Sequence, residues 1–228
     1  MSRTRRNLIR PPPFTEQLSS TVRTSYPNLR HLHVARYDFR DDPSAIKNIT
    51  YLPSNLDGLY LNQCELVVGS MASGIDFLEI PRVPLKNATE LFSLKQLQIV
   101  SFENSSCLGL SSIQALTKLC PYLVELNLNG CHRIRQGEEF NNVLVFYHRT
   151  MRRLYLRETR IDDDTIHCIC RKLKRLNILD IRQCQNVTNS IIDNLLTLKQ
   201  MKTLMIDNEL QVLYQQRSEQ QEKNLGLE

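Results

Sequence analysis

Glycine, proline and long apolar runs are scarce in this chain of 228 residues. It contains 7 glycines and 9 prolines, which excludes collagen-like chains and disordered chains rich in these two residues. No stretch approaches the roughly 18 uncharged apolar residues that a membrane-spanning helix needs, so we expect no membrane span. Residues 1–14 are basic but lack an apolar run and a small-residue cleavage site, so we expect no secretory signal.

The cysteine content favours an intracellular protein, and the chain lacks the sequence motifs of common cofactor and catalytic sites. The seven cysteines are odd in number and scattered, which favours reduced thiols in the cytoplasm, the nucleus or both over a disulfide framework. The net charge is +5, from 29 basic and 24 acidic residues. This mild excess does not favour nucleic acid as a partner, although a local basic face can still form.

The motifs of phosphate-binding loops, serine hydrolases and zinc proteases do not occur, so we expect no cofactor and no catalytic residue.

A hexamer with apolar residues at positions one, four and six recurs along the chain, and position four is Leu in every copy. The copies are Leu29–Val34, Leu56–Leu61, Ile75–Ile80, Leu94–Ile99, Leu123–Leu128, Met151–Leu156, Leu176–Ile181 and Met201–Ile206. One such hexamer is common in any Leu-rich chain. Eight in series, with starts 19 to 29 residues apart, indicate an internal repeat.

This spacing is typical of leucine-rich repeats, which run roughly 20–29 residues. Positions one, four and six would form a stacked core, while positions three and five of a short parallel strand point to the opposite face. The sequence therefore predicts an α/β fold, a right-handed leucine-rich-repeat solenoid of about eight repeats with a parallel sheet on its concave face and helices and turns on its convex face. We expect a basic, Pro-rich flexible arm over 1–14, an N-terminal cap over 15–28, the repeats over 29–209, and a C-terminal cap and polar tail over 210–228.

Four segments have the pattern of helices, and a fifth is expected to cap the last repeat. Ser111–Cys120 spaces its apolar residues for a helix, and Asp163–Leu173 begins with acidic and ends with basic residues, as the helix dipole prefers. Asn189–Leu198 has a similar pattern. Thr15–Ser25 and Leu210–Gln216 are predicted to cap the two ends of the repeats, with the polar residues after 217 fraying into solvent.

Three cysteines share one place in the repeat. Cys64, Cys131 and Cys184 lie three residues after the last apolar residue of their hexamers, so we expect them to be buried and unpaired. Leu126 and Leu179, at position four of two hexamers, are predicted core residues. The group His167, Cys168 and Cys170 lies on one predicted helix and lacks the second ligand pair of a zinc site, so we expect no metal site.

Two segments, LTKLCPYLVELNLNGCHRI and LKRLNILDIRQCQNVTNSIIDNL, resemble the cysteine-containing subclass of leucine-rich repeats. The shared features include the Cys120-Pro121 pair before one hexamer and the cysteine after each strand. This subclass occurs mainly in F-box/leucine-rich-repeat proteins, the substrate receptors of Skp/cullin/F-box (SCF) ubiquitin ligases. The resemblance implies a non-catalytic module like the substrate-binding part of such a ligase. The alternative is a stand-alone repeat scaffold or regulator with no link to ubiquitination.

The F-box itself is not recognisable in this sequence. No Leu-Pro-x-Glu opening occurs, and the residues before Leu29 include Pro11, Pro12 and Pro13. We therefore expect a Skp adaptor and a cullin as partners only for a longer form that carries an F-box. A protein substrate or ligand remains the expected partner of the repeats.

Proteins of this kind usually bind partners along the concave sheet, which places the candidate binding residues there. They are Arg153, Tyr155, Arg157, Arg182, Asn127, Asn129, Tyr60, Phe77, His31 and His33. Arg157 and Arg182 occupy the same place in adjacent repeats, so their guanidinium groups should be neighbours that suit an acidic or phosphorylated protein segment. The alternative is that Asp180, Glu158 and Glu125 neutralise the arginines in a solvated network of little energetic value.

Overall fold

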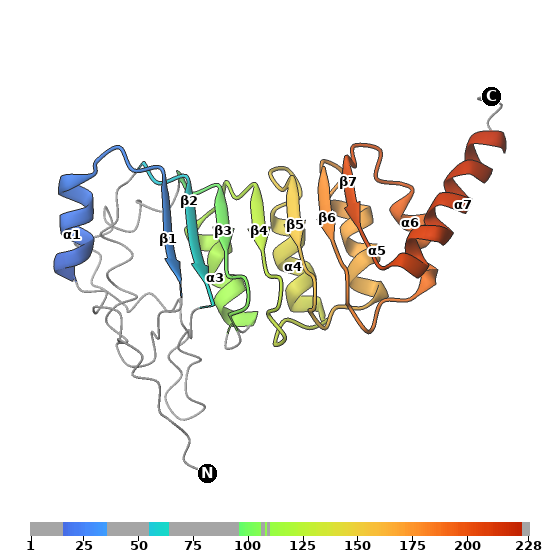
Figure 1. Cartoon of the computed structure of the whole chain (residues 1–228), viewed down its shortest axis with the longest axis horizontal. Coiled ribbons are helices and arrows are strands. Elements are labelled where there is room, and N and C mark those ends of the chain that lie inside the picture. The colour runs from blue at the N-terminus through green and yellow to red at the C-terminus, as the bar shows by residue number, and fades with distance from the viewer. Residues whose placement is uncertain (1–15, 36–54, 64–95, 106–107, 109, 225–228) are drawn as a thin grey trace, which may run out of the picture.

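A computed structural model describes residues 16–35, 55–63, 96–105, 108 and 110–224 of the chain. Seven strands form one parallel sheet and lie side by side in sequence order (Figure 1). They are β1 His31–Ala35, β2 Gly58–Asn62, β3 Ile99–Ser101, β4 Glu125–Asn127, β5 Arg153–Tyr155, β6 Ile178–Asp180 and β7 Thr203–Met205. The predicted α/β class with a parallel sheet is confirmed, and this arrangement is compatible with a leucine-rich-repeat solenoid.

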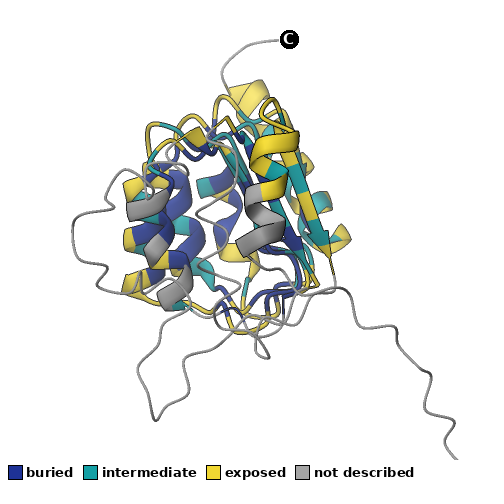
Figure 2. Cartoon of the chain, turned by 90° about the vertical axis from the view of Figure 1, so that its left-hand side faces the viewer, coloured by how far each residue is buried: buried dark blue, intermediate teal, exposed yellow. Residues whose placement is uncertain are grey.

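Helices cover one face of the sheet and flank its two ends (Figures 1 and 2). They are α1 Glu16–Ser25, α3 Leu110–Leu119, α4 Glu138–Phe146, α5 Asp163–Lys172, α6 Ile192–Leu195 and α7 Asn208–Asn224. Helices α3 to α7 contact one another in sequence order, so each repeat is stacked on its neighbours. No helix within the described ranges is both long and apolar enough to cross a membrane.

The core lies between the sheet and the helices and is built from stacked columns of apolar side chains. The central column, at position four of the hexamers, is Leu32, Leu59, Val100, Leu126, Leu154, Leu179 and Leu204. Leu126 and Leu179, the two predicted core residues, are 0% exposed. Leu32 and Leu204, in the first and last strands, are only partly buried. The two ends are therefore sealed by apolar side chains of the flanking segments, such as Val22 of α1 and Tyr214 of α7.

The position in the repeat where the sequence predicted cysteines carries small side chains that donate hydrogen bonds. We call it the turn position: the third residue after the last apolar residue of each hexamer. Cys131 Sγ donates to the main-chain oxygen of Phe102 at 3.1 Å, and Ser105 Oγ donates to that of Leu61 at 3.0 Å. Cys131 and Cys184 are both buried and unpaired, whereas Cys64 lies outside the described residues. The turn position thus supplies a donor for main-chain oxygens at the ends of strands.

The third and fourth predicted hexamers need correction. Strand β2 pairs directly with β3, with Gly58 opposite Ile99, so no strand lies between these two in the sheet. The third hexamer, Ile75–Ile80, was expected there and lies outside the described residues. The fourth hexamer is Leu97–Phe102, three residues later than predicted. Its apolar positions are 1–2% exposed, whereas Ile99 is only half-buried on the opposite face. Position four of this strand is Val100, whereas it is Leu in all eight predicted hexamers.

The helices differ from their predictions at three places. Residues 189–198 form a 3₁₀ turn, Asn189–Ile191, followed by the short helix α6, rather than one continuous helix. Helix α7 extends to Asn224, so it includes much of the segment that was predicted to fray. Helix α4 was not predicted, although Phe140, Val143 and Leu144 have helical spacing and are buried.

Candidate partner-binding face

The face of the sheet turned away from α3, α4, α5 and α6 presents two columns of side chains, and we call it the open face. The column before the central core column is His31, Gly58, Ile99, Glu125, Arg153, Ile178 and Thr203. The column after it is His33, Tyr60, Ser101, Asn127, Tyr155, Asp180 and Met205. Because parallel strands lie about 4.8 Å apart, neighbours in a column are close enough to touch.

Three aromatic side chains cluster at the β1–β2 end of the open face. The rings of His33 and Tyr60 stack with centroids 4.0 Å apart and planes within 2°. The Tyr60 hydroxyl lies 3.5 Å from Nδ1 of His31. Gly58 gives the His31 ring its room, because a Cβ there would lie 2.5 Å from Nδ1 of His31. The cluster is therefore a pre-ordered aromatic platform, which costs little conformational entropy on binding.

An ion pair and a tyrosine occupy the middle of the open face. Nε of Arg153 donates to Oε2 of Glu125 across β4 and β5. Burial, together with the carboxylates of Glu125 and Asp180, raises the pKa of Tyr155 against the opposing effect of Arg153. Tyr155 therefore keeps its proton at neutral pH and can act as a hydrogen-bond donor to a partner.

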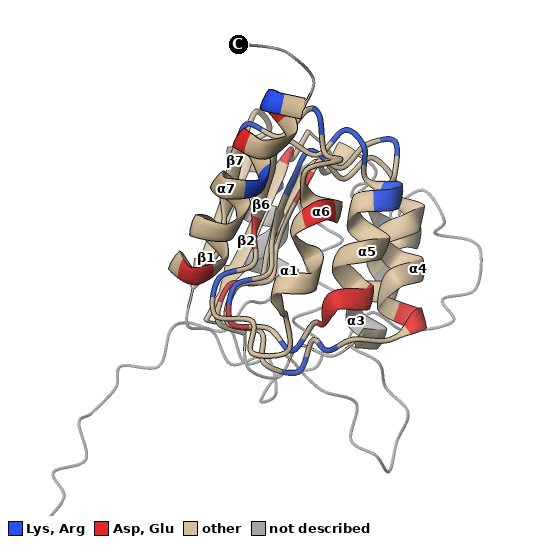
Figure 3. Cartoon of the chain, turned by 90° about the vertical axis from the view of Figure 1, so that its right-hand side faces the viewer, with Lys and Arg blue, Asp and Glu red and all other residues tan. Residues whose placement is uncertain are grey.

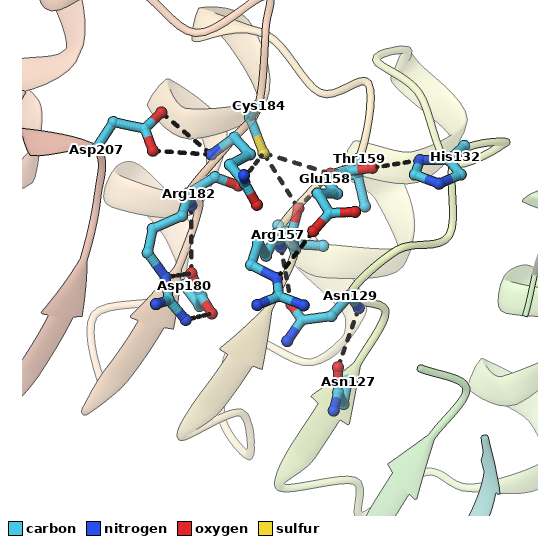
Figure 4. Close-up of polar contacts among 12 residues, drawn as sticks. Asn127, Asn129, His132, Arg157, Glu158, Thr159, Asp180, Arg182, Cys184 and Asp207 are labelled. Atoms are coloured by element: carbon cyan, nitrogen blue, oxygen red, sulfur yellow. Dashed lines mark hydrogen bonds and ion pairs between the residues drawn. The ribbon is translucent and has the colours of Figure 1, made fainter. Parts of the chain in front are cut away.

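Arg157 and Arg182 lie just beyond β5 and β6, and each one already has a carboxylate partner (Figure 4). Nε and Nη2 of Arg182 donate to the two oxygens of Asp180, at 2.9 and 2.8 Å. Asp180 is 1% exposed. Nε of Arg157 lies 3.3 Å from Oε1 of Glu158. The neighbouring arginines that the sequence suggested thus lie within a network of both charges.

The two asparagines of the predicted site have internal hydrogen bonds. Asn127 Oδ1 accepts from the main-chain N–H of Asn129 at 3.0 Å, and Asn129 Oδ1 accepts from that of Arg157 at 2.8 Å (Figure 4). Asn129 is 8% exposed. The Asn129 side chain thus ties β4 to the turn after β5 and presents little surface to a partner.

The structure places nine of the ten predicted binding residues on the open face or in the turns directly after its strands. Phe77 lies outside the described residues. Sequence reasoning missed Gly58, Ile99, Ser101 and Ile178, which belong to the same columns. Ile99 and Ser101 would have been found with the fourth hexamer three residues later. No group of three or more His, Cys, Asp or Glu side chains in the described part of the chain is placed to hold a metal ion.

Neither the known protein-family models nor the curated proteins gave a match to the sequence. Among solved structures, the chain is similar to one chain of the crystal structure of the Rad7 and Elc1 complex in yeast. The TM-score is 0.53 and the sequence identity is 17%. The similarity covers 81% of this chain and 46% of that chain, so the present chain corresponds to less than half of its length. At this identity the similarity shows a shared fold.

Proposed function

We propose that this chain is a non-catalytic protein-recognition module, a leucine-rich-repeat solenoid that binds a protein partner along its open face. The observation that carries the proposal is the continuity of that face across seven strands in register. Its aromatic and polar side chains are held on a rigid sheet, and aromatic residues and arginine are enriched in protein interfaces. The similar yeast chain comes from a structure of a protein complex, which supports protein binding for the present chain.

The charges of the open face favour a partner of mixed polar character over a strongly acidic one. Each of Arg153, Arg157 and Arg182 is paired with a carboxylate. A phosphate or carboxylate of the partner would have to displace the present carboxylate or lie beside it, at a cost in repulsion. Tyr60 and Tyr155 would instead supply apolar contact area and hydroxyl groups. An acidic or phosphorylated segment remains the alternative.

Within this function, the finer proposal is the substrate-binding part of an SCF-type ubiquitin ligase in the cytoplasm or nucleus. It rests on the resemblance of residues 116–134 and 173–195 to F-box-associated repeats, and the shared fold is compatible with it. The alternative is a free-standing scaffold without ubiquitin chemistry. Recovery of a Skp adaptor and a cullin with the chain, or with a longer form of it, would separate the two.

The test compares two pairs of tyrosines in native affinity purification with nuclease present. Tyr60→Ala with Tyr155→Ala removes aromatic contacts from the open face. Tyr26→Ala with Tyr122→Ala is the matched control, because these two side chains are 62% and 60% exposed and lie in the turns before β1 and β4. We expect the co-purified proteins to be lost from the open-face variant and kept by the control. Equal recovery in both variants would contradict binding at the open face.

A further inference from the structure

One edge of the sheet is formed by the turns that lead from helices into strands. Main-chain hydrogen bonds hold these turns in a row: Arg152 N–H donates to the oxygen of Val124, Asn177 N–H to that of Arg152, and Lys202 N–H to that of Asn177, each at 2.8 Å. The turns are therefore spaced like the strands, about 4.8 Å apart. Consecutive turns therefore follow one another in a row along this edge.

Positive charge gathers on this edge, and we call residues 148–152, 171–177 and 196–202 the basic edge. These residues include no Asp or Glu, and their eight cations are Arg149, Arg152, Arg171, Lys172, Lys174, Arg175, Lys199 and Lys202. All but Arg152 are exposed. Figure 3 shows Lys and Arg at one end of α5 and in the adjoining turns, and Asp and Glu at the opposite ends of α4 and α5.

The cations of the basic edge are not neutralised. None of the eight forms an ion pair with a carboxylate among the residues that the structure describes. Arg152 and Arg175 instead donate to main-chain oxygens, including that of Arg149 at 3.2 and 3.3 Å. This differs from the open face and the turns directly after its strands, where Arg153, Arg157 and Arg182 are each paired with a carboxylate. A line of unpaired cations produces a field that attracts an extended polyanion.

Helix dipoles explain only part of this charge. Arg171 and Lys172 lie in the last turn of α5, where a cation is favourable. Lys199 and Lys202 lie beyond the end of α6 at Leu195, and the dipole effect does not extend past the terminal turn. The remaining cations have no carboxylate partner within the described residues, and Arg152, Lys174 and Arg175 donate to uncharged oxygens instead.

Exposed aromatic rings continue the line of cations. In the described residues the exposed large hydrophobic side chains are Tyr26, Tyr122, Phe146, Val212 and Leu213. Tyr26 and Tyr122 lie in the turns before β1 and β4, and Phe146 is the last residue of α4, just before the first cationic turn. Cations beside exposed rings are the combination that single-stranded nucleic acids use, because bases stack on the rings while the cations follow the phosphates.

We propose that the basic edge binds single-stranded nucleic acid, with its lysines and arginines along the phosphate backbone and with Tyr122 and Phe146 stacked on bases. The net charge of +5 conceals this surface, because it averages the eight cations with carboxylates elsewhere, such as Asp163 and Asp164 at the opposite end of α5. The proposal is independent of protein binding at the open face, since the two surfaces share no side chain.

Two triple variants of equal charge test the proposal. Arg171→Gln, Lys172→Gln and Lys202→Gln remove three cations from the basic edge. Arg133→Gln, Arg135→Gln and Arg160→Gln remove three exposed cations from the opposite edge. The purified chain is titrated into a labelled oligothymidylate of about 20 nucleotides, and fluorescence anisotropy is recorded between about 50 and 200 mM salt.

We expect the basic-edge triple to bind the oligothymidylate at least about tenfold more weakly. The slope of log K against log salt should also be smaller in magnitude by about 2, because each lost phosphate contact contributes about 0.7 for single strands. The opposite-edge triple should bind like the unmodified chain. Tyr122→Ala with Phe146→Ala should weaken binding by at least about fivefold, as the loss of base stacking would. Circular dichroism melts would verify that each variant is folded.

Three results would overturn the proposal: no binding of the oligothymidylate at the lowest salt, equal losses in the two triples, or tighter binding to a duplex of equal length. A third probe is a vesicle containing phosphatidylserine. Binding to the vesicle without binding to the oligothymidylate would assign the edge to a membrane surface and would also contradict the proposal.

Discussion

The Sγ of Cys184 donates a hydrogen bond to the main-chain oxygen of Leu156, 3.1 Å away, and this bond ties the turn after β6 to the end of the preceding strand. The hydroxyl of Thr159 donates to the same oxygen at 2.6 Å. Cysteine, serine and threonine thus occupy the turn position in different repeats. What these residues share is a small side chain with one donor, and this explains why the cysteine pattern is irregular in the sequence.

The first prediction concerns this donor. Cys184→Ala should lower the free energy of unfolding by about 1–2 kcal/mol, because it removes a buried hydrogen bond and leaves a small cavity. Cys184→Ser should cost less, since a hydroxyl can make the same bond. Cys120→Ala is the control: Cys120 is 1% exposed and has no hydrogen-bond partner among the described residues. Urea unfolding should show a larger loss for Cys184→Ala than for the control, and equal losses would remove the role assigned to the bond.

The buried thiols should be chemically inert in the folded chain. Burial raises the pKa of Cys131 to about 12, and burial is also the main cause of the raised pKa of Cys184. The reactive thiolate is therefore rare at about pH 8. We expect slow alkylation of both residues in buffer and rapid alkylation in urea, followed by mass spectrometry of the peptides. Rapid labelling of both thiols in the folded chain would contradict their placement.

The same pKa shifts give a pH dependence of stability. The folded-state pKa of Cys131 lies above the unfolded-state value of about 8.5, so the contribution to stability is fully present below about pH 8.5. It is lost as the pH rises toward 12, because the unfolded chain releases its proton first. Cys131→Ser should weaken this alkaline loss in urea unfolding measured across that range.

The central core column should carry a large part of the stability. Leu126 and Leu179 are each 0% exposed, and truncation of either to Ala should cost roughly 2–5 kcal/mol. Leu213→Ala on α7 is the control, because Leu213 is 37% exposed, and we expect a change within about 0.5 kcal/mol. Urea melts that show less than about 1 kcal/mol for both core variants would contradict the register of the sheet.

The strands were predictable because each one lies within a hexamer that has apolar side chains at three fixed positions, which is a strong signal even for short strands. The fourth hexamer was displaced because Leu94–Ile99 fits the template with Leu at position four, whereas the strand in the structure has Val100 at that position, paired with Leu59 and Leu126. Helix α4 was missed because its apolar residues follow Gly137 without a side-chain cap. Local sequence therefore located the repeats but did not determine every register.

The candidate site was predictable in its columns but not in its electrostatics. Once the repeats are aligned, the alternation of a strand places Tyr60, Asn127 and Tyr155 in one column. The pairing of Arg182 with Asp180 could be named from sequence only as an alternative, since it depends on side-chain conformation. The basic edge was hidden because its cations come from three separate turns, and only the stacking of repeats brings them together.

We expect that Gly130 is required by a close contact with a neighbouring side chain and not by its backbone angle alone. The residue before the turn position has a positive φ in five repeats, at Gln63, Asn104, Gly130, Glu158 and Gln183, with values of 56° to 69°. Four of the five are not glycine. A Cβ on Gly130, however, would lie 2.0 Å from Oδ1 of Asn104.

We therefore expect Gly130→Ala to lower the free energy of unfolding by roughly 1–3 kcal/mol. Asn104→Ala should relieve part of this loss in the double variant, because it removes the atom that clashes. A double-mutant cycle by urea unfolding should give a favourable coupling energy of about 0.5 kcal/mol or more. Additive losses would show that backbone strain, and not Asn104, requires the glycine.

Asp163 should link two repeats in a pH-dependent way. Its carboxylate accepts from the N–H of Thr188 at 2.7 Å and from the hydroxyl of Ser190 at 2.6 Å, and so it holds Thr188, the N-cap residue of the 3₁₀ turn of the next repeat, in place. Partial burial alone would raise the pKa of Asp163. The hydrogen bonds from Ser190 and Thr188, together with the nearby His167, have the opposite and larger effect, so the pKa of Asp163 lies below its usual value. A depressed pKa means that this stabilisation is present above the unfolded-state value of about 3.9 and is lost as the pH falls through the folded-state pKa.

Asp163→Asn should therefore cost about 1–2 kcal/mol at neutral pH, because it replaces a charged acceptor of three hydrogen bonds with a neutral one. Urea unfolding of the variant and of the unmodified chain should converge as the pH is lowered through the folded-state pKa, since the unmodified carboxyl is then also neutral. Asp164→Asn, at the next and exposed position of α5, is the control and should have little effect at either pH. A loss that stays the same at acidic pH would show that Asp163 acts through its shape and not through its charge.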